Sequence, residues 1–378
     1  MLDYVRGTRA DPYRPYKIML AVDAAMVAGT LATHALRNAY HEHSLLLVSY
    51  EFGFMKRALI GELMSYGFPK ISLLHVYALG VATWLSVLVA FLLLFKRCFG
   101  FRRETLPLLA FILGSPFFFK NFMLAVGHFD LFGCLAAILA ILLPVTLFYP
   151  LILGIAAVLL LLVHHIHFLL YLPTIAVIAV LRWRHRRAIT PAQVALWGAI
   201  ALVVVAAFVK LAYFSSAPVS REVLLDAMRA RALGPVEPRP DIWFATIADE
   251  LRKTWQMLPV NIYGFPLYVL LALLHLPLIR FGANLIRNLA DDIDRMLVWL
   301  GLAAVSAAFI VIFVVVYDYS RWVSNWAVCM MLIMHTVTLL PAREAPAEPP
   351  LAPAAPGNVA CAWALTLIPR VGIVMPFH

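Results

Sequence analysis

Long apolar runs separated by short polar stretches make up most of this chain. Runs of about 18 or more apolar residues can cross the hydrocarbon core of a bilayer as helices, and only a helix satisfies its own backbone hydrogen bonds there. We count ten such runs, at residues 17–36, 71–95, 105–120, 129–147, 149–165, 167–181, 191–213, 259–279, 296–317 and 322–341. The pattern therefore predicts an all-α polytopic membrane protein with about ten transmembrane helices, with an eleventh open at the C-terminus.

The composition agrees with a membrane location. Of the 378 residues, 63% are hydrophobic and 13% are charged, which is too little charge to cover a water-soluble globule. The net charge of +10 comes from loops beside the predicted spans, where lipid headgroups and topology account for it, so we expect no nucleic-acid partner. The four cysteines have no metal-site or disulfide spacing.

The basic loops predict the orientation. Short loops rich in Lys and Arg stay on the cytoplasmic side of a membrane. The N-terminus and the loops 96–103, 182–187 and 280–295 carry this excess, so we expect a cytoplasmic N-terminus. The loops 37–70 and 214–258 then face outward, and we expect a multi-pass membrane protein surrounded by lipids.

Three parts follow from these patterns. Residues 1–341 form the predicted transmembrane domain, and residues 342–357 are a linker rich in Pro and Ala. Residues 358–378 are hydrophobic but contain Pro369 and Arg370, so the pattern does not decide whether they span, lie on the surface or pack elsewhere.

The first outer loop contains a predicted amphipathic helix from Glu51 to Met64. Apolar residues recur there at helical spacing, and interfacial amphipathic helices have this pattern. The helix would bring one acid, Glu51, and two cations, Lys56 and Arg57, to the outer surface. The alternative is a structural belt over the ends of the spans.

Histidines and a carboxylate mark the next two outer loops. His128 and Asp130 precede a predicted span, where Asp130 could cap the helix or form a proton-transfer pair with His128. His164 and His167 are three residues apart, which puts them on one face if the helix continues, and His165 lies beside them. Three histidines could hold an anionic headgroup, move a proton or simply end a helix.

A last pair of charges follows the ninth predicted span. Asp318 and Arg321 are three residues apart and could bridge each other, or Arg321 could hold a phosphate with its planar guanidinium. Asp23 lies inside the first apolar run, and we expect it to be ion-paired, near Lys17, rather than catalytic. No metal site is predicted, although a divalent metal cofactor is left open.

All these clusters fall on the outer side, which favours a shared polar chamber over scattered buried charges. The layout resembles the GT-C superfamily of membrane glycosyltransferases, whose members have a cytoplasmic N-terminus and a first outer loop with interfacial helices and an acidic residue. The basic N-terminus and the stretch Tyr50-Glu51-Phe52-Gly53-Phe54-Met55-Lys56-Arg57-Ala58-Leu59-Ile60-Gly61-Glu62 carry the likeness. Many members have an acidic pair early in this loop, and this chain has His41-Glu42-His43 and Glu51 instead.

The resemblance implies that residues 1–341 are the transmembrane catalytic domain of a glycosyltransferase in the bacterial inner (plasma) membrane. Such an enzyme moves a sugar or oligosaccharide from a polyprenyl-linked donor to a glycan or lipid acceptor at the periplasmic face. Glu51, Asp130 and Asp318 are the candidate catalytic carboxylates. The candidate substrate- and phosphate-binding residues are Lys56, Arg57, His128, His164, His165, His167 and Arg321. Two alternatives are an acyltransferase that modifies surface glycans with a histidine base, and a transporter or flippase of a lipid-linked anion.

Overall fold

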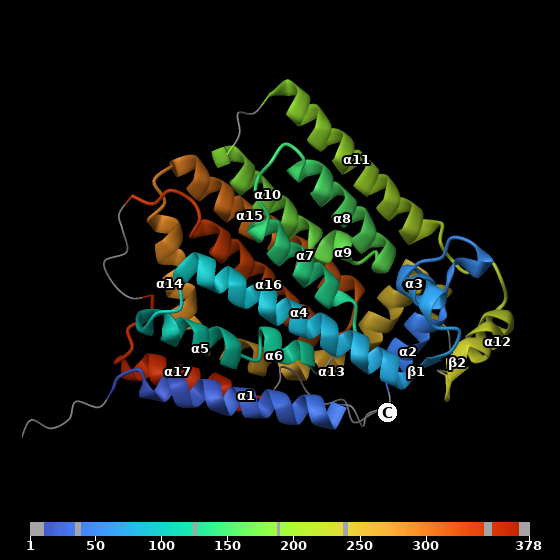
Figure 1. The fold of residues 1–378 in the computed structure, drawn as a ribbon, viewed down its shortest axis with the longest axis horizontal. Coiled ribbons are helices and arrows are strands. Elements are labelled where there is room, and N and C mark those ends of the chain that lie inside the picture. Colours follow the sequence, from blue (N-terminus) through green and yellow to red (C-terminus); the bar gives the residue numbers. More distant parts are fainter. Residues whose placement is uncertain are drawn as a thin grey trace, which may run out of the picture.

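The computed structural model describes residues 11–34, 39–123, 127–186, 190–236, 241–343 and 350–369. These residues are almost entirely helical, as the apolar pattern predicts (Figure 1). Six helical segments in the described ranges are long and apolar enough to cross a membrane. They are Arg14–Thr33, Leu73–Phe99, Arg103–Phe122, Pro191–Tyr213, Ile247–Leu274 and Asp292–Val315.

The other four predicted spans correspond to shorter or more polar helices. These are α7 (Asp130–Leu142), α8 (Tyr149–Val163), α10 (Leu172–Arg186) and α16 (Tyr319–Val337). With 13 residues, α7 extends only about 20 Å, less than the hydrocarbon thickness of about 30 Å. The count of ten spans therefore stays a prediction.

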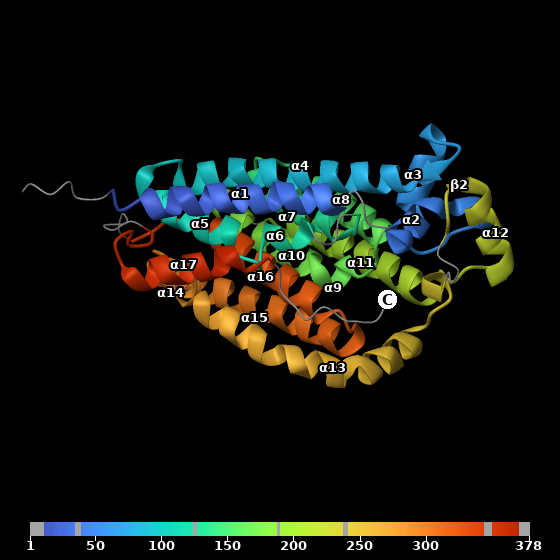
Figure 2. The ribbon, with the colours of Figure 1, turned by 90° about the horizontal axis from the view of Figure 1, so that it is seen from below.

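Local capping signals explain where the long helices begin. Thr190 and Thr246 accept hydrogen bonds from the backbone at the starts of α11 (Pro191–Tyr213) and α13 (Ile247–Leu274), and Gln193 and Asp249 complete the two capping boxes. Helix α13 contains Pro259 and Pro266 and curves along one edge of the bundle (Figure 2). Proline bends a helix because it lacks an amide hydrogen.

The core of the bundle is apolar and is built from central helices. Helix α4 (Leu73–Phe99) packs against α7, and α10 packs against α7, α15 (Asp292–Val315) and α16. Helices α11 and α13 lie at the periphery and expose most of their apolar surface. This arrangement suits helices that face lipid.

The two predicted outer loops fold together at one end of the bundle (Figure 1). This end contains α2 (Tyr40–Leu47), η1 (Tyr50–Phe52), α3 (Leu59–Gly67), α12 (Arg221–Arg231) and η4 (Asp241–Trp243), and we call it the cap. Strands β1 (Ile71–Ser72) and β2 (Ala232–Leu233) pair in parallel and join the two loops. A separate apolar cluster centred on Met55, Met228 and Trp243 holds the cap together.

The predicted amphipathic helix from Glu51 to Met64 is wrong in its first half. Instead of one helix, η1 is followed by a turn, and α3 begins only at Leu59. Gly53 has a φ of 101° and Arg57 a φ of 62°, and neither value is compatible with a right-handed helix.

The hydrophobic C-terminal segment packs into the bundle as far as the structure describes it. Helix α17 (Pro356–Leu367) contacts α1 (Arg14–His34), α5 (Leu106–Gly114) and α13. Residues 370–378 lie outside the described residues. Within the predicted linker, Ala342 bridges Leu289 and the Leu351 side chain is buried.

Asp23 is ion-paired, but not near Lys17. Its carboxylate lies 2.7 Å from Nζ of Lys120, on α6 (Phe119–Phe122), and both side chains are buried. The Lys120 ammonium also donates hydrogen bonds to the carbonyl oxygens of Gly114 and Thr366. One buried cation thus connects α1, α5 and α17.

Candidate functional site

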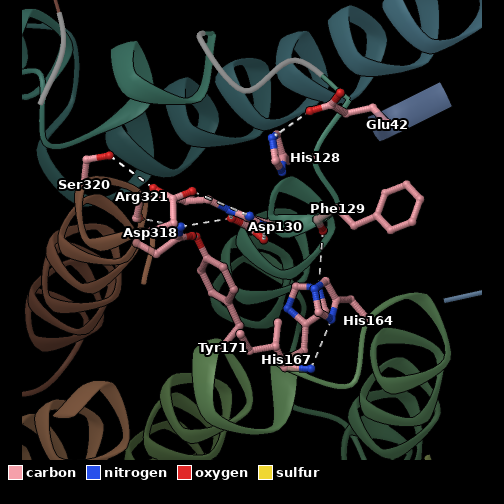
Figure 3. Close-up of polar contacts among 12 residues, drawn as sticks. Glu42, His128, Phe129, Asp130, His164, His167, Tyr171, Asp318, Ser320 and Arg321 are labelled. Atoms are coloured by element: carbon pink, nitrogen blue, oxygen red, sulfur yellow. Dashed lines mark hydrogen bonds and ion pairs between the residues drawn. The ribbon is translucent and has the colours of Figure 1, made fainter. Parts of the chain in front are cut away.

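Ionisable side chains from distant parts of the sequence meet between the bundle and the cap (Figure 3). Their neighbours Phe129 and Val163 belong to the apolar cluster of the cap. We call this group the outer polar cluster, after the predicted outer loops beside it. It contains Glu42, Arg57, His128, Asp130, His164, His165, His167 and Arg321.

The centre of the cluster is a two-pronged ion pair between Asp130 and Arg321. Asp130 begins α7, and Arg321 lies in the first turn of α16. Nε of Arg321 is 2.5 Å from Oδ2 of Asp130, and Nη2 is 2.6 Å from Oδ1. Because both oxygens of the buried carboxylate are engaged, Asp130 holds the guanidinium in one orientation.

Sequence reasoning missed two residues that extend this pair. Asn325 donates from Nδ2 to Oδ2 of Asp130 at 3.2 Å and accepts a hydrogen bond of 2.7 Å from the Tyr171 hydroxyl. Asn325 is one helical turn after Arg321, a spacing that could have identified it. Tyr171 had no such signal, because it comes from a different part of the chain.

His128 pairs with Glu42 rather than with Asp130. Its Nε2 lies 2.8 Å from Oε1 of Glu42, on α2, and both side chains are largely buried. Burial raises the pKa of the Glu42 carboxyl, but the charge and hydrogen bond of His128 outweigh this effect and lower that pKa to about 2. Glu42 was noted in the sequence only as part of His41-Glu42-His43, because nothing there showed that α2 would face the Gly127–His128 turn.

The three histidines His164, His165 and His167 do not lie on one helix. His164 ends α8 with an extended backbone (φ −161°, ψ 110°), and α9 (His167–Leu170) begins after a turn. The rings of His164 and His167 are nevertheless edge to face, with centroids 6.2 Å apart. Nε2 of His167 hydrogen-bonds to the carbonyl oxygen of Phe129 at 3.2 Å, which positions the ring next to the start of α7.

Two histidine nitrogens in this group are buried without a partner. Within the described residues, neither Nδ1 of His165 nor Nδ1 of His167 has a hydrogen-bond partner. The described part of the chain also holds no group of three His, Cys, Asp or Glu side chains arranged for a metal ion.

Lys56 is a buried cation and Arg57 a partly buried one, and both lie on the cap side of the cluster. Nζ of Lys56 donates to the carbonyl oxygen of Ala245 at 2.8 Å, which joins the two outer loops. Burial, assisted by the charge of Arg57, lowers the pKa of Lys56 to about 8. Within the described residues, neither cation has a carboxylate at ion-pair distance.

Arg57 is the less satisfied of the two. Its Nε is buried and has no hydrogen-bond partner in the described part of the structure. Burial lowers the pKa of Arg57 to about 10, and the charges of Glu250, Arg321 and Asp130 also act on it. Arg57 therefore lies close to the Asp130–Arg321 pair and has unused hydrogen-bonding capacity.

The structure does not bring Glu51 or Asp318 into the centre of the cluster. Glu51 lies on η1 with an exposed side chain, on the side of Arg231. The Asp318 carboxylate is partly exposed, accepts a hydrogen bond of 3.3 Å from Ser320 and lies 3.9 Å from Nη1 of Arg321. Asp130, rather than Asp318, is thus the main partner of Arg321.

The arrangement has the chemistry of an anion site beside a proton-transfer pair. Lys56 and Arg57 supply positive charge without a carboxylate partner, and a bound phosphate would supply the missing negative charge and acceptor oxygens. Glu42 and His128 form the carboxylate–imidazole combination that transfers protons in many enzymes. Comparison with models of protein families, with curated proteins and with solved structures finds no match to this chain.

Proposed function

We propose that this chain is a membrane glycosyltransferase of the GT-C type. It moves a sugar or oligosaccharide from a polyprenyl-linked donor to a glycan or lipid acceptor at the periplasmic face of the bacterial inner membrane. The observation that carries the proposal is a pair of cations beside the Glu42–His128 pair, the buried Lys56 and the partly buried Arg57, which have no carboxylate at ion-pair distance among the described residues.

The cations suit the phosphate of a lipid-linked donor. When the bond between the sugar carbon and the phosphate oxygen breaks, its electrons stay on the phosphate, which gains negative charge. Arg57 and Lys56 stabilise this charge, because fixed donors in a water-poor site favour a charge that develops in the transition state. Asp130 keeps Arg321 beside them in a fixed orientation.

The Glu42–His128 pair is the proposed base. Glu42 accepts the hydrogen bond from Nε2 of His128, which leaves Nδ1 free to take the proton of the acceptor hydroxyl. The hydroxyl oxygen then attacks the sugar carbon as the phosphate departs, with inversion at that carbon. Asp130 is less suited to this role, because Arg321 engages both of its oxygens.

The membrane arrangement is part of the proposal. The short helices α7, α8, α10 and α16 would cross the bilayer inside the ring of longer helices, which gives the ten spans of a GT-C-like layout. With the N-terminus in the cytoplasm, the cap and the outer polar cluster would face the periplasm, where polyprenyl-linked sugars are used.

Amide substitutions in reconstituted vesicles test the proposed base. We expect Glu42→Gln to lower the consumption of a polyprenyl-linked sugar by about a hundredfold or more, because a weaker partner no longer orients and stabilises the imidazole. Glu104→Gln, an exposed change at the opposite end of the molecule, is the matched control and should keep full turnover.

The same vesicles separate the rival assignments. Loss of turnover in Glu51→Gln with full activity in Glu42→Gln would assign the base to Glu51 instead. Acyl transfer that depends on His164, His165 or His167 and tolerates both amides would favour an acyltransferase. Movement of the intact lipid-linked substrate without bond breaking would favour a flippase.

A further inference from the structure

A cavity of about 280 Å³ lies where the cap meets the start of α13. Its walls come from the first residue of α12, from η4 and the turn after it, and from the first two turns of α13. The side chains that matter here are Arg221, Asp241, Phe244, Asp249, Glu250 and Lys253. None of them belongs to the outer polar cluster.

Three of these charged groups already have interaction partners within the protein. Arg221 lies 3.2 Å from Asp241 and stacks over the ring of Phe244. Asp249 accepts hydrogen bonds from the amide and hydroxyl of Thr246 at 3.0 and 2.7 Å, which caps α13. These interactions fix the walls of the cavity.

Glu250 and Lys253 are the groups left for a ligand. Within the described residues, Glu250 has neither an ion pair nor a hydrogen bond through its carboxylate, and Lys253 contacts only the face of the Tyr317 ring, 4.8 Å from its centroid. They lie three residues apart on α13, so both side chains reach the same face. One acceptor group and one donor group thus border the same cavity.

The lining selects a class of ligand. Its three acids and two cations give charges of both signs, which disfavours a polyanion such as a diphosphate or a nucleic acid. A carboxylate and an ammonium bind hydroxyl groups, and Phe244 adds an apolar side chain to the wall, a combination that suits the polar and apolar surface of a sugar. The volume accommodates a single sugar ring rather than a long chain.

The cavity shares a wall with the outer polar cluster. Ala245 lines the cavity, and its carbonyl oxygen accepts the hydrogen bond from Lys56. Glu250 also lies close enough to Lys56 and Arg57 for its charge to act on both. A ligand in the cavity is therefore separated from the proposed phosphate site by one residue layer.

We infer that this cavity binds an uncharged sugar residue of the acceptor, with Glu250 and Lys253 holding its hydroxyl groups. The assignment of this sugar to the acceptor rests on the proposed function, whereas the binding of a sugar does not.

Direct binding tests the inference independently of turnover. The purified full-length protein in detergent is titrated with methyl glycosides of glucose, galactose, mannose and N-acetylglucosamine, and binding is followed by saturation-transfer NMR. We expect saturable binding of at least one glycoside, weakened about tenfold by Glu250→Gln and by Lys253→Gln. Asp226→Asn, an exposed acid on α12, is the control and should bind as the wild type does.

Two results would overturn the inference: no saturable binding of any glycoside to the wild type, or equal binding by the wild type and both cavity variants. Sugar binding without any consumption of a polyprenyl-linked donor would leave the cavity assignment in place and would remove the proposed function. Donor consumption that is insensitive to Glu250→Gln, together with unchanged glycoside binding, would leave the proposed function in place and would remove the cavity assignment.

Discussion

At Arg57 two unfavourable features coincide. A left-handed backbone costs a residue with a side chain about 1–2 kcal/mol, and a buried guanidinium atom without a partner adds a further cost. Such features persist where the surrounding structure enforces them, and they concentrate at functional sites. We interpret Arg57 as a preorganised anion-binding residue.

Lys56 makes the proposed site sensitive to pH. Its pKa is lowered to about 8, so the ammonium is charged below that pH and loses its charge as the pH rises through it. The phosphodiester of a lipid-linked donor does not titrate in this range. We therefore expect the KM for the donor to be constant from about pH 6.5 to 7.5 and to rise above about pH 8, by up to tenfold per pH unit.

Lys56→Arg is the control for this profile, because the pKa of a guanidinium, even lowered to about 10 as in Arg57, lies above that of Lys56. The variant should show a donor KM that stays nearly constant between about pH 8 and 9. If the donor KM rose equally in the variant and in the wild type, a group other than Lys56 would be responsible for the pH dependence.

The separate residues of the cluster were predictable from the sequence, but their pairing was not. Asp130, Arg321 and the histidines stood out as ionisable groups beside apolar runs. The partner of His128 depends on how α2 meets the turn before α7, which is a tertiary contact between segments more than 80 residues apart. Local spacing therefore favoured Asp130, and the structure has Glu42 instead.

At the scale of the elements, Gly133 decides how closely α7 approaches the histidines. A Cβ atom at this position would lie 2.4 Å from Cδ2 of Tyr171 and 2.6 Å from Cε1 of His167. Helix propensity alone favours alanine over glycine by about 1 kcal/mol, whereas overpacking costs about 1–3 kcal/mol. The contacts are with the rings of Tyr171 and His167, which hydrogen bonds hold in place. We therefore expect the cost of overpacking to exceed the gain from helix propensity.

Gly133→Ala should therefore lower the free energy of unfolding in detergent by about 1 kcal/mol and displace His167. Gly198→Ala in α11 is the matched control, because a Cβ there meets nothing within 4 Å. We expect that variant to be as stable as the wild type or slightly more so. Equal stability changes in the two variants would contradict the close packing.

Element boundaries were the least predictable part of the fold. Apolar periodicity located the long helices but extended a helix through Gly53 and Arg57, where the backbone takes positive φ values. The three-residue spacing of His164 and His167 also suggested a shared helical face, although the chain turns between them. Both errors occur where side chains of the cluster are positioned, and tertiary contacts override local preference at such places.

At the scale of the whole molecule, the buried Asp23–Lys120 pair attaches the C-terminal helix to the bundle. Removing one partner of a buried pair typically costs about 3–5 kcal/mol, because the other charge is left uncompensated. We expect Lys120→Met to destabilise the protein by about this amount and to make α17 accessible to proteolysis.

The double variant Asp23→Leu/Lys120→Met tests whether the unpaired charge causes the loss of stability in Lys120→Met. Replacing both charges with apolar side chains should recover most of the lost stability, because no unpaired charge then remains. A double variant as unstable as Lys120→Met alone would instead assign the loss to the hydrogen bonds with Gly114 and Thr366.

The convergence of ionisable groups at one end of the molecule was the prediction that followed most directly from the chain. Lipid is a poor solvent for charge, so polar clusters between apolar runs were expected to gather. Most of them do, between the bundle and the cap, while Glu51 stays outside. The cavity beside α13 could not be predicted, since its walls depend on how α12, η4 and the start of α13 fold against one another within the predicted outer loop 214–258.

The proposed function is tested most directly by the consumption of a polyprenyl-linked sugar by wild-type protein and by Arg57→Asn in reconstituted vesicles. Asparagine tolerates the left-handed backbone and removes only the cation. We expect turnover by the wild type and a loss of about a hundredfold or more in the variant, with the fold intact. Equal turnover in the two proteins, or none in the wild type with either a monophosphate-linked or a diphosphate-linked donor, would contradict it.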